Sequence, residues 1–201
     1  MMKIKLYLFI ATISLLSACK KETEPNINNF TGKVTRVVVT RDNWAVNFII
    51  DFKNDSDKAV VLFANGFPKR DKPEQAGLMM KIPDFTTPLA SFAISDNTLN
   101  IPPHTTRKFL FIYAQFTPNL WKEITKSNAE KELTNIINSA LFNYRYVPNI
   151  INKYYTNHDP DRYSVFKKNF KIEKNDLKVE FTDCLSIDDA LTMIDGKVIE
   201  L

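Results

Sequence analysis

Glycine, histidine and cysteine are scarce, and their spacing excludes several kinds of site. The chain has only four glycines, and none of them stands at the spacing of a phosphate-binding loop. The two histidines, His104 and His158, cannot form an H-E-x-x-H zinc helix, and the two cysteines, Cys19 and Cys184, form no C-x-x-C pair. The chain carries no catalytic motif that we can identify. We therefore predict a protein that is not an enzyme and has neither a cofactor nor a metal site.

The composition is that of a folded domain with little excess charge. Hydrophobic residues make up 44% of the 201 residues and charged residues 25%, which argues against a disordered chain. The 27 basic and 23 acidic residues give a net charge of +4, and two of the lysines, Lys3 and Lys5, precede a predicted cleavage site. Nucleic-acid-binding domains usually show a strong basic excess. We therefore expect no nucleic-acid partner and a single folded domain over residues 31–201.

Residues 1–18 have the order of a secretory signal peptide. A basic start precedes an apolar run over residues 6–16, which is too short to cross a bilayer as a helix. The sequence Leu-Ser-Ala-Cys at 16–19 follows at once. It resembles the lipobox of bacterial lipoproteins, and this resemblance implies cleavage before Cys19 and acylation of that cysteine, for example with palmitate. The alternative is an ordinary secretory leader that contains a cysteine.

Residues 19–30 are predicted to form a lipidated cysteine followed by a flexible tether. The segment is polar, has no apolar periodicity and contains Pro25. Several acyl chains together make a stable membrane anchor. The charges at 20–24 resemble in part the export signal of surface lipoproteins from the Bacteroidota phylum. This resemblance implies an outer-membrane protein, anchored by lipid and facing the cell exterior.

Alternating apolar residues predict strands in the first half of the domain. The strand predicted at 44–52 carries on one face Trp44, Val46, Phe48, Ile50 and Phe52. A polar turn and a second apolar stretch follow, so we predict an antiparallel hairpin over 44–63. Residues 107–116 are apolar on both faces, as in a central strand that is covered on each side.

The segment 33–116 resembles the immunoglobulin-like β-sandwiches of exported bacterial lipoproteins. The resemblance lies in the Asn-Asp-Ser turn after a long strand and in the proline pair at 102–103 before an aromatic strand. His104 stands where glycine usually follows such a pair, and the Cys…Trp…Cys core of true immunoglobulin domains is absent. The resemblance implies a mainly antiparallel β-sandwich; a different sandwich or a split sheet is the alternative.

Helical periodicity interrupts the strands near residues 118–155. Apolar residues recur at three- and four-residue steps from 128 to 145, which predicts a helix, and Pro148 ends the pattern. Strand texture returns at 163–172 and 177–182. The predicted class is therefore α+β: a β-sandwich with a helical insertion at 118–155.

The C-terminus allows two interpretations. Asp195-Gly196 lies between two apolar stretches, which predicts a β-hairpin over 191–201. A helical turn over 186–192 is the alternative. Just before it, Cys184 has no partner if Cys19 carries lipid, and we expect it to be a buried small hydrophobic residue.

Two polar clusters could carry chemistry, and each has a simpler explanation. The first supplies oxygen ligands of the kind that calcium prefers: Asp51, Asn54, Asp55 and Asp57. A plain turn is the stronger interpretation, because the same residue types satisfy the backbone of a turn. The second cluster is the loop 157–162, in which His158 lies beside carboxylates. A solvated loop is again the stronger interpretation.

Tyrosine and asparagine are concentrated over residues 144–163. Tyrosine offers a large apolar face with a polar tip, and asparagine offers adaptable hydrogen bonds, which suits a protein or glycan surface. Tyr144 continues the predicted helix stripe and is expected in the core. Tyr154, Tyr155 and Tyr163 lie beyond Pro148 and are the predicted contact residues.

These observations favour a non-enzymatic, lipid-anchored surface protein that binds another surface macromolecule or an envelope complex. An inhibitor or immunity-type lipoprotein is the second possibility, and a hydrolase that uses the loop 157–162 is the third. The oligomeric state, and whether calcium binds near Asp55 and Asp57, do not follow from the sequence.

Overall fold

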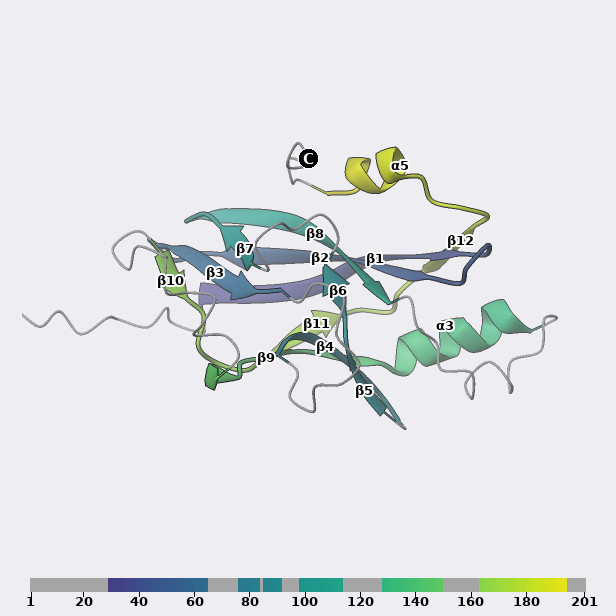
Figure 1. The fold of residues 1–201 in the computed structure, drawn as a ribbon, viewed down its shortest axis with the longest axis horizontal. Coiled ribbons are helices and arrows are strands. Elements are labelled where there is room, and N and C mark those ends of the chain that lie inside the picture. The colour runs from purple at the N-terminus through teal and green to yellow at the C-terminus, as the bar shows by residue number, and fades with distance from the viewer. Residues whose placement is uncertain are drawn as a thin grey trace, which may run out of the picture.

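The computed structural model has a mostly β fold (Figure 1). It describes residues 29–64, 76–83, 85–91, 98–113, 128–149 and 163–194. The predicted signal peptide and most of the predicted tether, the loop 157–162 and the segment 195–201 lie outside these ranges.

Most of the described strands belong to one long, curved sheet. Its order is β5 (Phe85–Pro88), β4 (Gly77–Ile82), β9 (Leu141–Arg145), β11 (Phe170–Lys174), β1 (Phe30–Thr40), β2 (Val46–Asn54), β8 (Thr105–Tyr113) and β6 (Ala90–Ser91). The strand β12 (Val179–Thr182) pairs with the second half of β1. The strands β1, β2 and β8 form one layer, and β4, β9 and β11 form a facing layer (Figure 1).

One short segment brings the two ends of this sheet together. Residues 85–88 pair with β4, and the amide of Leu89 donates to the carbonyl of Leu78 at 2.9 Å. The next two residues, Ala90 and Ser91, pair with β8 at the other end of the sheet. The sheet is therefore nearly closed into a barrel.

A smaller sheet contains β10 (Tyr163–Val165), β3 (Ala59–Phe63) and β7 (Thr98–Ile101), in that order. The predicted hairpin over 44–63 is therefore wrong. Both edges of β2 are occupied by β1 and β8, whereas β3 pairs with β7 and β10. The turn after β2 carries the chain into another sheet instead of back along its own edge.

The core lies between the two layers and confirms the apolar face predicted at 44–52 except at Trp44, which precedes β2 and is only half-buried. Val46, Phe48, Ile50 and Phe52 are all fully buried. Phe48 contacts Phe142 of the facing layer edge to face, with ring centroids 5.1 Å apart. Aromatic contacts of this kind add to the free energy of apolar burial. Side chains of both layers thus form one core.

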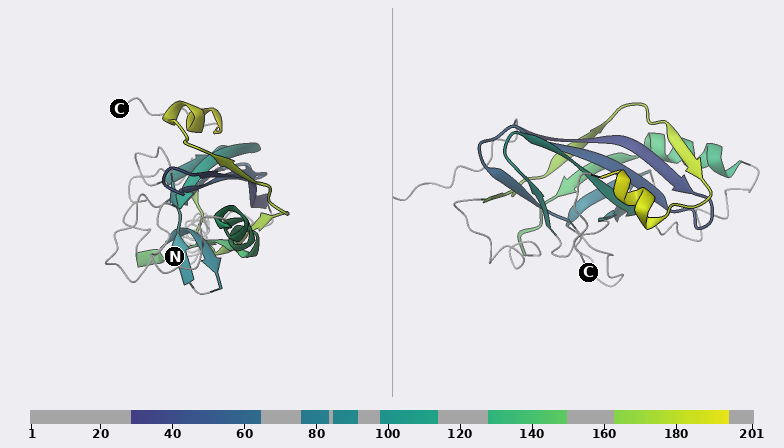
Figure 2. Two further views of the ribbon diagram at one scale, coloured as in Figure 1. Left: turned by 90° about the vertical axis from the view of Figure 1, so that its right-hand side faces the viewer. Right: turned by 90° about the horizontal axis from the view of Figure 1, so that it is seen from above.

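The predicted central strand at 107–116 is observed as β8, over its described part. Phe111 is buried in the main core, and Leu110 is buried on the opposite face. The cover over Leu110 comes from α5 (Ile187–Thr192), whose Ala190 is buried against it. Figure 2 shows α5 outside the β1–β2–β8 layer.

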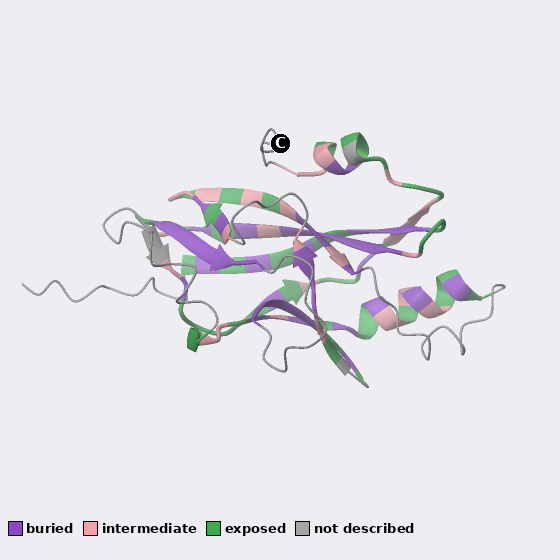
Figure 3. Ribbon diagram, in the orientation of Figure 1, coloured by how far each residue is buried: buried purple, intermediate pink, exposed green. Residues whose placement is uncertain are grey.

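Helix α3 (Ala129–Ser139) is shorter than the helix predicted over 128–145. Its buried residues, Ala129, Leu133 and Ile137, are spaced four apart as in the predicted stripe, and Figure 3 shows buried positions recurring along the helix. The extension to 145 is wrong, because residues 141–145 form strand β9 between β4 and β11.

The strand β9 also corrects the predicted helical insertion over 118–155. Phe142 and Tyr144 are buried, whereas Leu141 and Arg145 are exposed, which is the alternation of a strand. Pairing on both edges outweighs the weak helical periodicity of these residues. The predicted helix start at 117–118 lies outside the described residues.

Residues 187–192 form a helix, as the alternative interpretation of this segment predicts. Ser186 is the N-cap of α5, and its hydroxyl oxygen accepts a hydrogen bond from the amide of Asp189 at 3.1 Å. The hairpin predicted over 191–201 is therefore wrong at its start, and Asp195-Gly196 lies beyond the last described residue.

The predicted strand at 163–172 is split between the two sheets. Residues 163–165 form β10 beside β3, and residues 170–174 form β11 beside β1 and β9. The strand predicted at 177–182 is observed as β12. The strands β11 and β12 run parallel to β1, and β10 runs parallel to β3, so the sheets are less uniformly antiparallel than predicted.

An ion pair between Arg36 and Glu180 joins β1 to β12. Because of this pair, we expect the free energy of unfolding to depend weakly on pH. The Arg36 guanidinium donates two hydrogen bonds to Glu180, at 2.7 and 3.1 Å, which lowers the pKa of Glu180 below its usual value. The contribution of this ion pair to the free energy of unfolding is therefore complete above the pKa that Glu180 has in the unfolded chain. It is lost as the pH falls through the lower pKa that Glu180 has in the folded protein.

Replacing Glu180 by glutamine should lower the free energy of unfolding by less than about 1 kcal/mol at neutral pH, because the pair is solvent-exposed. The difference from the wild type should disappear in acid. Urea denaturation at both pH values measures this effect. Glu173→Gln is the control; an equal pH dependence in both variants would contradict a specific role of the Arg36 pair.

Candidate functional site

The structure describes one of the three tyrosines predicted to contact a partner. Tyr163 begins β10 and is paired in register with Ala59, whereas Tyr154 and Tyr155 lie outside the described residues. Tyr144 is buried, as predicted, and its hydroxyl accepts a hydrogen bond from the amide of Phe63 at 3.0 Å. Tyr144 thus links β9 to β3, although it does so from a strand and not from a helix.

The polar cluster after β2 is organised as a turn around a buried asparagine. The side-chain amide nitrogen of Asn54 donates to the backbone carbonyl oxygens of Lys58 (2.8 Å), Ile101 (3.0 Å) and Pro102 (3.1 Å). Its side-chain oxygen accepts hydrogen bonds from the amide and the hydroxyl of Ser56. Asn54 therefore serves the backbone, as the turn interpretation predicts, and it connects the β2–β3 turn to the β7–β8 turn.

Two carboxylates of this cluster, Asp51 and Asp57, contact polar side chains on neighbouring elements. Asp51 accepts a hydrogen bond from the Thr35 hydroxyl at 3.2 Å, and Asp57 lies 3.0 Å from Nε2 of His104. His104 adopts a positive φ of 52°, a conformation that glycine adopts most easily. It lies in the turn between β7 and β8, directly after the proline pair at 102–103. Among the described residues, no group of three or more acidic, histidine or cysteine side chains could hold a metal ion.

Cys184 is exposed, so its predicted burial is wrong. It follows the last residues of β12, where the chain turns away from the sheet toward the N-cap of α5. The carbonyl of Cys184 accepts a hydrogen bond from the Thr182 hydroxyl at 3.1 Å. The alternating pattern of 177–182 therefore ends before the cysteine.

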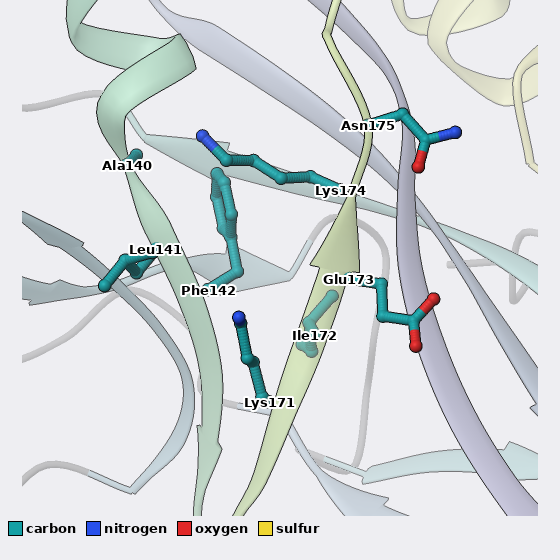
Figure 4. A pocket seen from close by; sticks show the side chains of 8 residues that line it. All are labelled: Ala140, Leu141, Phe142, Lys171, Ile172, Glu173, Lys174 and Asn175. Atoms are coloured by element: carbon teal, nitrogen blue, oxygen red, sulfur yellow. The ribbon is translucent and has the colours of Figure 1, made fainter.

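A pocket of about 380 Å³ lies between the start of β9 and the end of β11. Paired residues along β9 and β11 end at Phe142 and Ile172, and β11 then continues along β1, where Glu173 lies opposite Lys33. The two strands thus diverge. We call this pocket the β9–β11 groove, and its lining residues are Ala140, Leu141, Phe142, Lys171, Ile172, Glu173, Lys174 and Asn175 (Figure 4).

Basic side chains lie on the outward face of the sheet at and beside this groove. Side chains alternate along β9, so Leu141 and Arg145 point outward while Phe142 is buried. Lys81 of β4 is the cross-strand neighbour of Leu141, and Lys171 is the cross-strand neighbour of Asn143. Directly opposite side chains on neighbouring strands lie about 5 Å apart at Cβ. The basic residues at 81, 145 and 171 therefore share one face of the sheet.

Lys174 closes the end of the groove next to α3. Its ammonium donates to the carbonyl oxygens of Ile137, at 3.3 Å, and of Asn138, so it neutralises the negative end of the helix. Partial burial lowers the pKa of Lys174. The amide of Leu177 also donates to the side chain of Asn138 at 3.3 Å, and these contacts hold α3 against the end of β11.

Sequence reasoning missed the β9–β11 groove because residues 141–145 were assigned to a helix. The signal that could have identified it is the order apolar, aromatic, polar, aromatic, basic at these five positions. That order places Asn143 and Arg145 on one face of a strand. Finding Lys171 and Lys81 on the same face required the strand pairing.

No family model, curated protein or solved structure matches the chain. Among the helices that the structure describes, none is long and apolar enough to cross a membrane.

Proposed function

We propose that this protein is a lipid-anchored, non-enzymatic binding protein of a bacterial outer membrane. The observation that carries the proposal is the sequence Leu-Ser-Ala-Cys at 16–19, directly after a basic start and an apolar run. A leader of this order is typical of an exported protein. Acylation of Cys19 would then attach the mature chain to the membrane.

The position of the folded domain supports this arrangement. The first strand, β1, begins at Phe30, and Phe30 is buried in the core beside Phe52 and Phe166. Only a short polar segment separates that strand from Cys19. A tether of this length would hold the domain close to the bilayer, and the charges at 20–24 favour the outward-facing side of the outer membrane.

The binding partner in this proposal is a protein or a glycan at the cell surface. The proposed contact residues are Tyr154, Tyr155 and Tyr163, because tyrosine combines a large apolar face with a polar tip. We also propose that the fold is a variant of the immunoglobulin-like β-sandwich. Two facing layers of strands, and the turn at 102–104 before β8, support this assignment.

Replacing Cys19 by serine should abolish lipid attachment, because serine cannot form the thioether that carries the diacylglycerol. The variant should remain uncleaved at this site or be released from its lipid. Membrane fractionation and the intact mass of the mature protein measure this outcome. Wild-type protein that is soluble and carries no lipid mass on residue 19 would overturn the anchor.

The binding half of the proposal is tested by purifying the wild-type protein from membranes in a mild detergent. A stoichiometric partner should co-purify with it. Alanine at Tyr154, Tyr155 and Tyr163 should reduce retention of that partner while thermal unfolding stays nearly unchanged. Unfolding at a markedly lower temperature with full retention would instead assign these tyrosines to the core.

A further inference from the structure

Basic side chains at and beside the β9–β11 groove have no ion-pair partner among the residues that the structure describes. Lys81, Arg145 and Lys171 are exposed on one face, and none of them forms an ion pair with another described residue. Glu173 is the acidic residue among the groove's lining residues, and Asp176 acts electrostatically on Lys174. Figure 4 shows its carboxylate pointing away from Lys171 and Lys174. Like charges gathered at a pocket raise the local concentration of anions.

The two lining lysines extend toward β9 from different positions on β11. Figure 4 shows the ammonium groups of Lys171 and Lys174 on the side of β9, with Phe142 between them. Lys174 is held in place by the carbonyl oxygens at the end of α3, whereas Lys171 is exposed. One cation is therefore preorganised and the other is free to close on a ligand, and preorganisation lowers the entropy cost of binding.

The groove also offers an apolar contact at its rim. Leu141 is 46% exposed, and it is the large hydrophobic side chain that the described surface leaves most open. It lies beside Lys81 on the neighbouring strand and lines the groove together with Lys171. A ligand that satisfies both features carries an anionic group and a short apolar part.

We propose that the β9–β11 groove binds a small organic anion, a carboxylate or a phosphate monoester with a short apolar chain. The anionic group contacts the exposed ammonium of Lys171, Lys174 adds positive charge at the end of the groove, and the apolar chain lies against Leu141. A volume of about 380 Å³ accommodates a molecule of this size. The site requires neither the lipid anchor nor the tyrosines, so it goes beyond the function proposed above.

The test uses the mature wild-type chain in a non-ionic detergent and three probes. Hexanoate carries both chemical features, inorganic phosphate carries the charge alone, and hexanol carries the chain alone. Hexanoate should bind most tightly and should shift the backbone amide resonances of residues 140–142 and 171–175. Phosphate should bind more weakly, and hexanol should leave these resonances unchanged.

Lys171→Gln should weaken hexanoate binding about fivefold, which corresponds to one partly screened charge contact of about 1 kcal/mol. The matched control is Lys58→Gln, which removes an exposed lysine of the β2–β3 turn and should leave the affinity unchanged. Lys174 is not suited to this test, because its loss would also free the end of α3.

Three results would overturn the proposal. The first is the absence of hexanoate binding, and the second is equal binding of phosphate and hexanoate, which would indicate an adventitious ion only. The third is an equal loss of affinity in the Lys171 and Lys58 variants, which would indicate a general charge effect. All three leave the lipid anchor untested, so they are distinguishable from a failure of the proposed function.

Discussion

Replacing Phe48 by alanine is expected to lower the free energy of unfolding by about 3–5 kcal/mol. The ring is fully buried at the centre of β2 and contacts Phe142 of the facing layer. Truncation removes the apolar surface that it buries and leaves a cavity between the two facing layers. The layers can close around this cavity only in part, because the surrounding core is close-packed.

Chemical denaturation, with a check that the slope against denaturant is unchanged, measures this loss. The control is Leu141→Ala, which truncates a large side chain that is 46% exposed and should change the stability by no more than about 0.5 kcal/mol. A loss below about 1 kcal/mol for Phe48→Ala would place this face of β2 in solvent and contradict the two-layer core.

Replacing Asn54 by leucine is expected to cost about 3 kcal/mol, although leucine has nearly the same shape. The substitution leaves the carbonyl oxygens of Lys58, Ile101 and Pro102 without the hydrogen bonds that the amide nitrogen donates. Asn54 is fully buried, so water cannot easily replace those bonds. The connection between the β2–β3 and β7–β8 turns would be lost with them.

Thermal or urea unfolding of Asn54→Leu, beside Asp55→Ala, separates this role from general damage to the turn. Asp55 follows Asn54 directly and forms an exposed ion pair with Lys53, so its loss should cost less than about 1 kcal/mol. Equal stability of the two variants would show that the buried amide contributes nothing specific.

The sequence predicted best where a local period matched the face that packs into the main core. The alternation in β2 and the stripe of Leu133 and Ile137 in α3 both mark that face, although the opposite face of β2 is partly buried as well, with Ile49 in a second cluster beside Leu110. The short helix α5 was one of two interpretations for its segment. The Ser186 cap, together with the packing of Ala190 over Leu110, explains why the helix forms.

The prediction was wrong where pairing with distant strands decided the structure. Residues 141–145 fit a helical stripe only loosely, but β4 and β11 are positioned to pair with both of their edges. The hairpin predicted over 44–63 was wrong for a related reason. Its second strand found its partners at 98–101 and 163–165, far away in the sequence. Local patterns contain no information about such partners.

By itself the sequence determined the apolar faces, the positions of several turns and the order of residues at the N-terminus on which the proposed lipid anchor rests. Each of these depends on a few neighbouring residues. The tertiary structure alone decided that one segment joins the two ends of a curved sheet, and that Lys81, Arg145 and Lys171 lie on one face of that sheet. Those three basic residues come from three strands, and only hydrogen-bonded pairing between the strands places them on the same face.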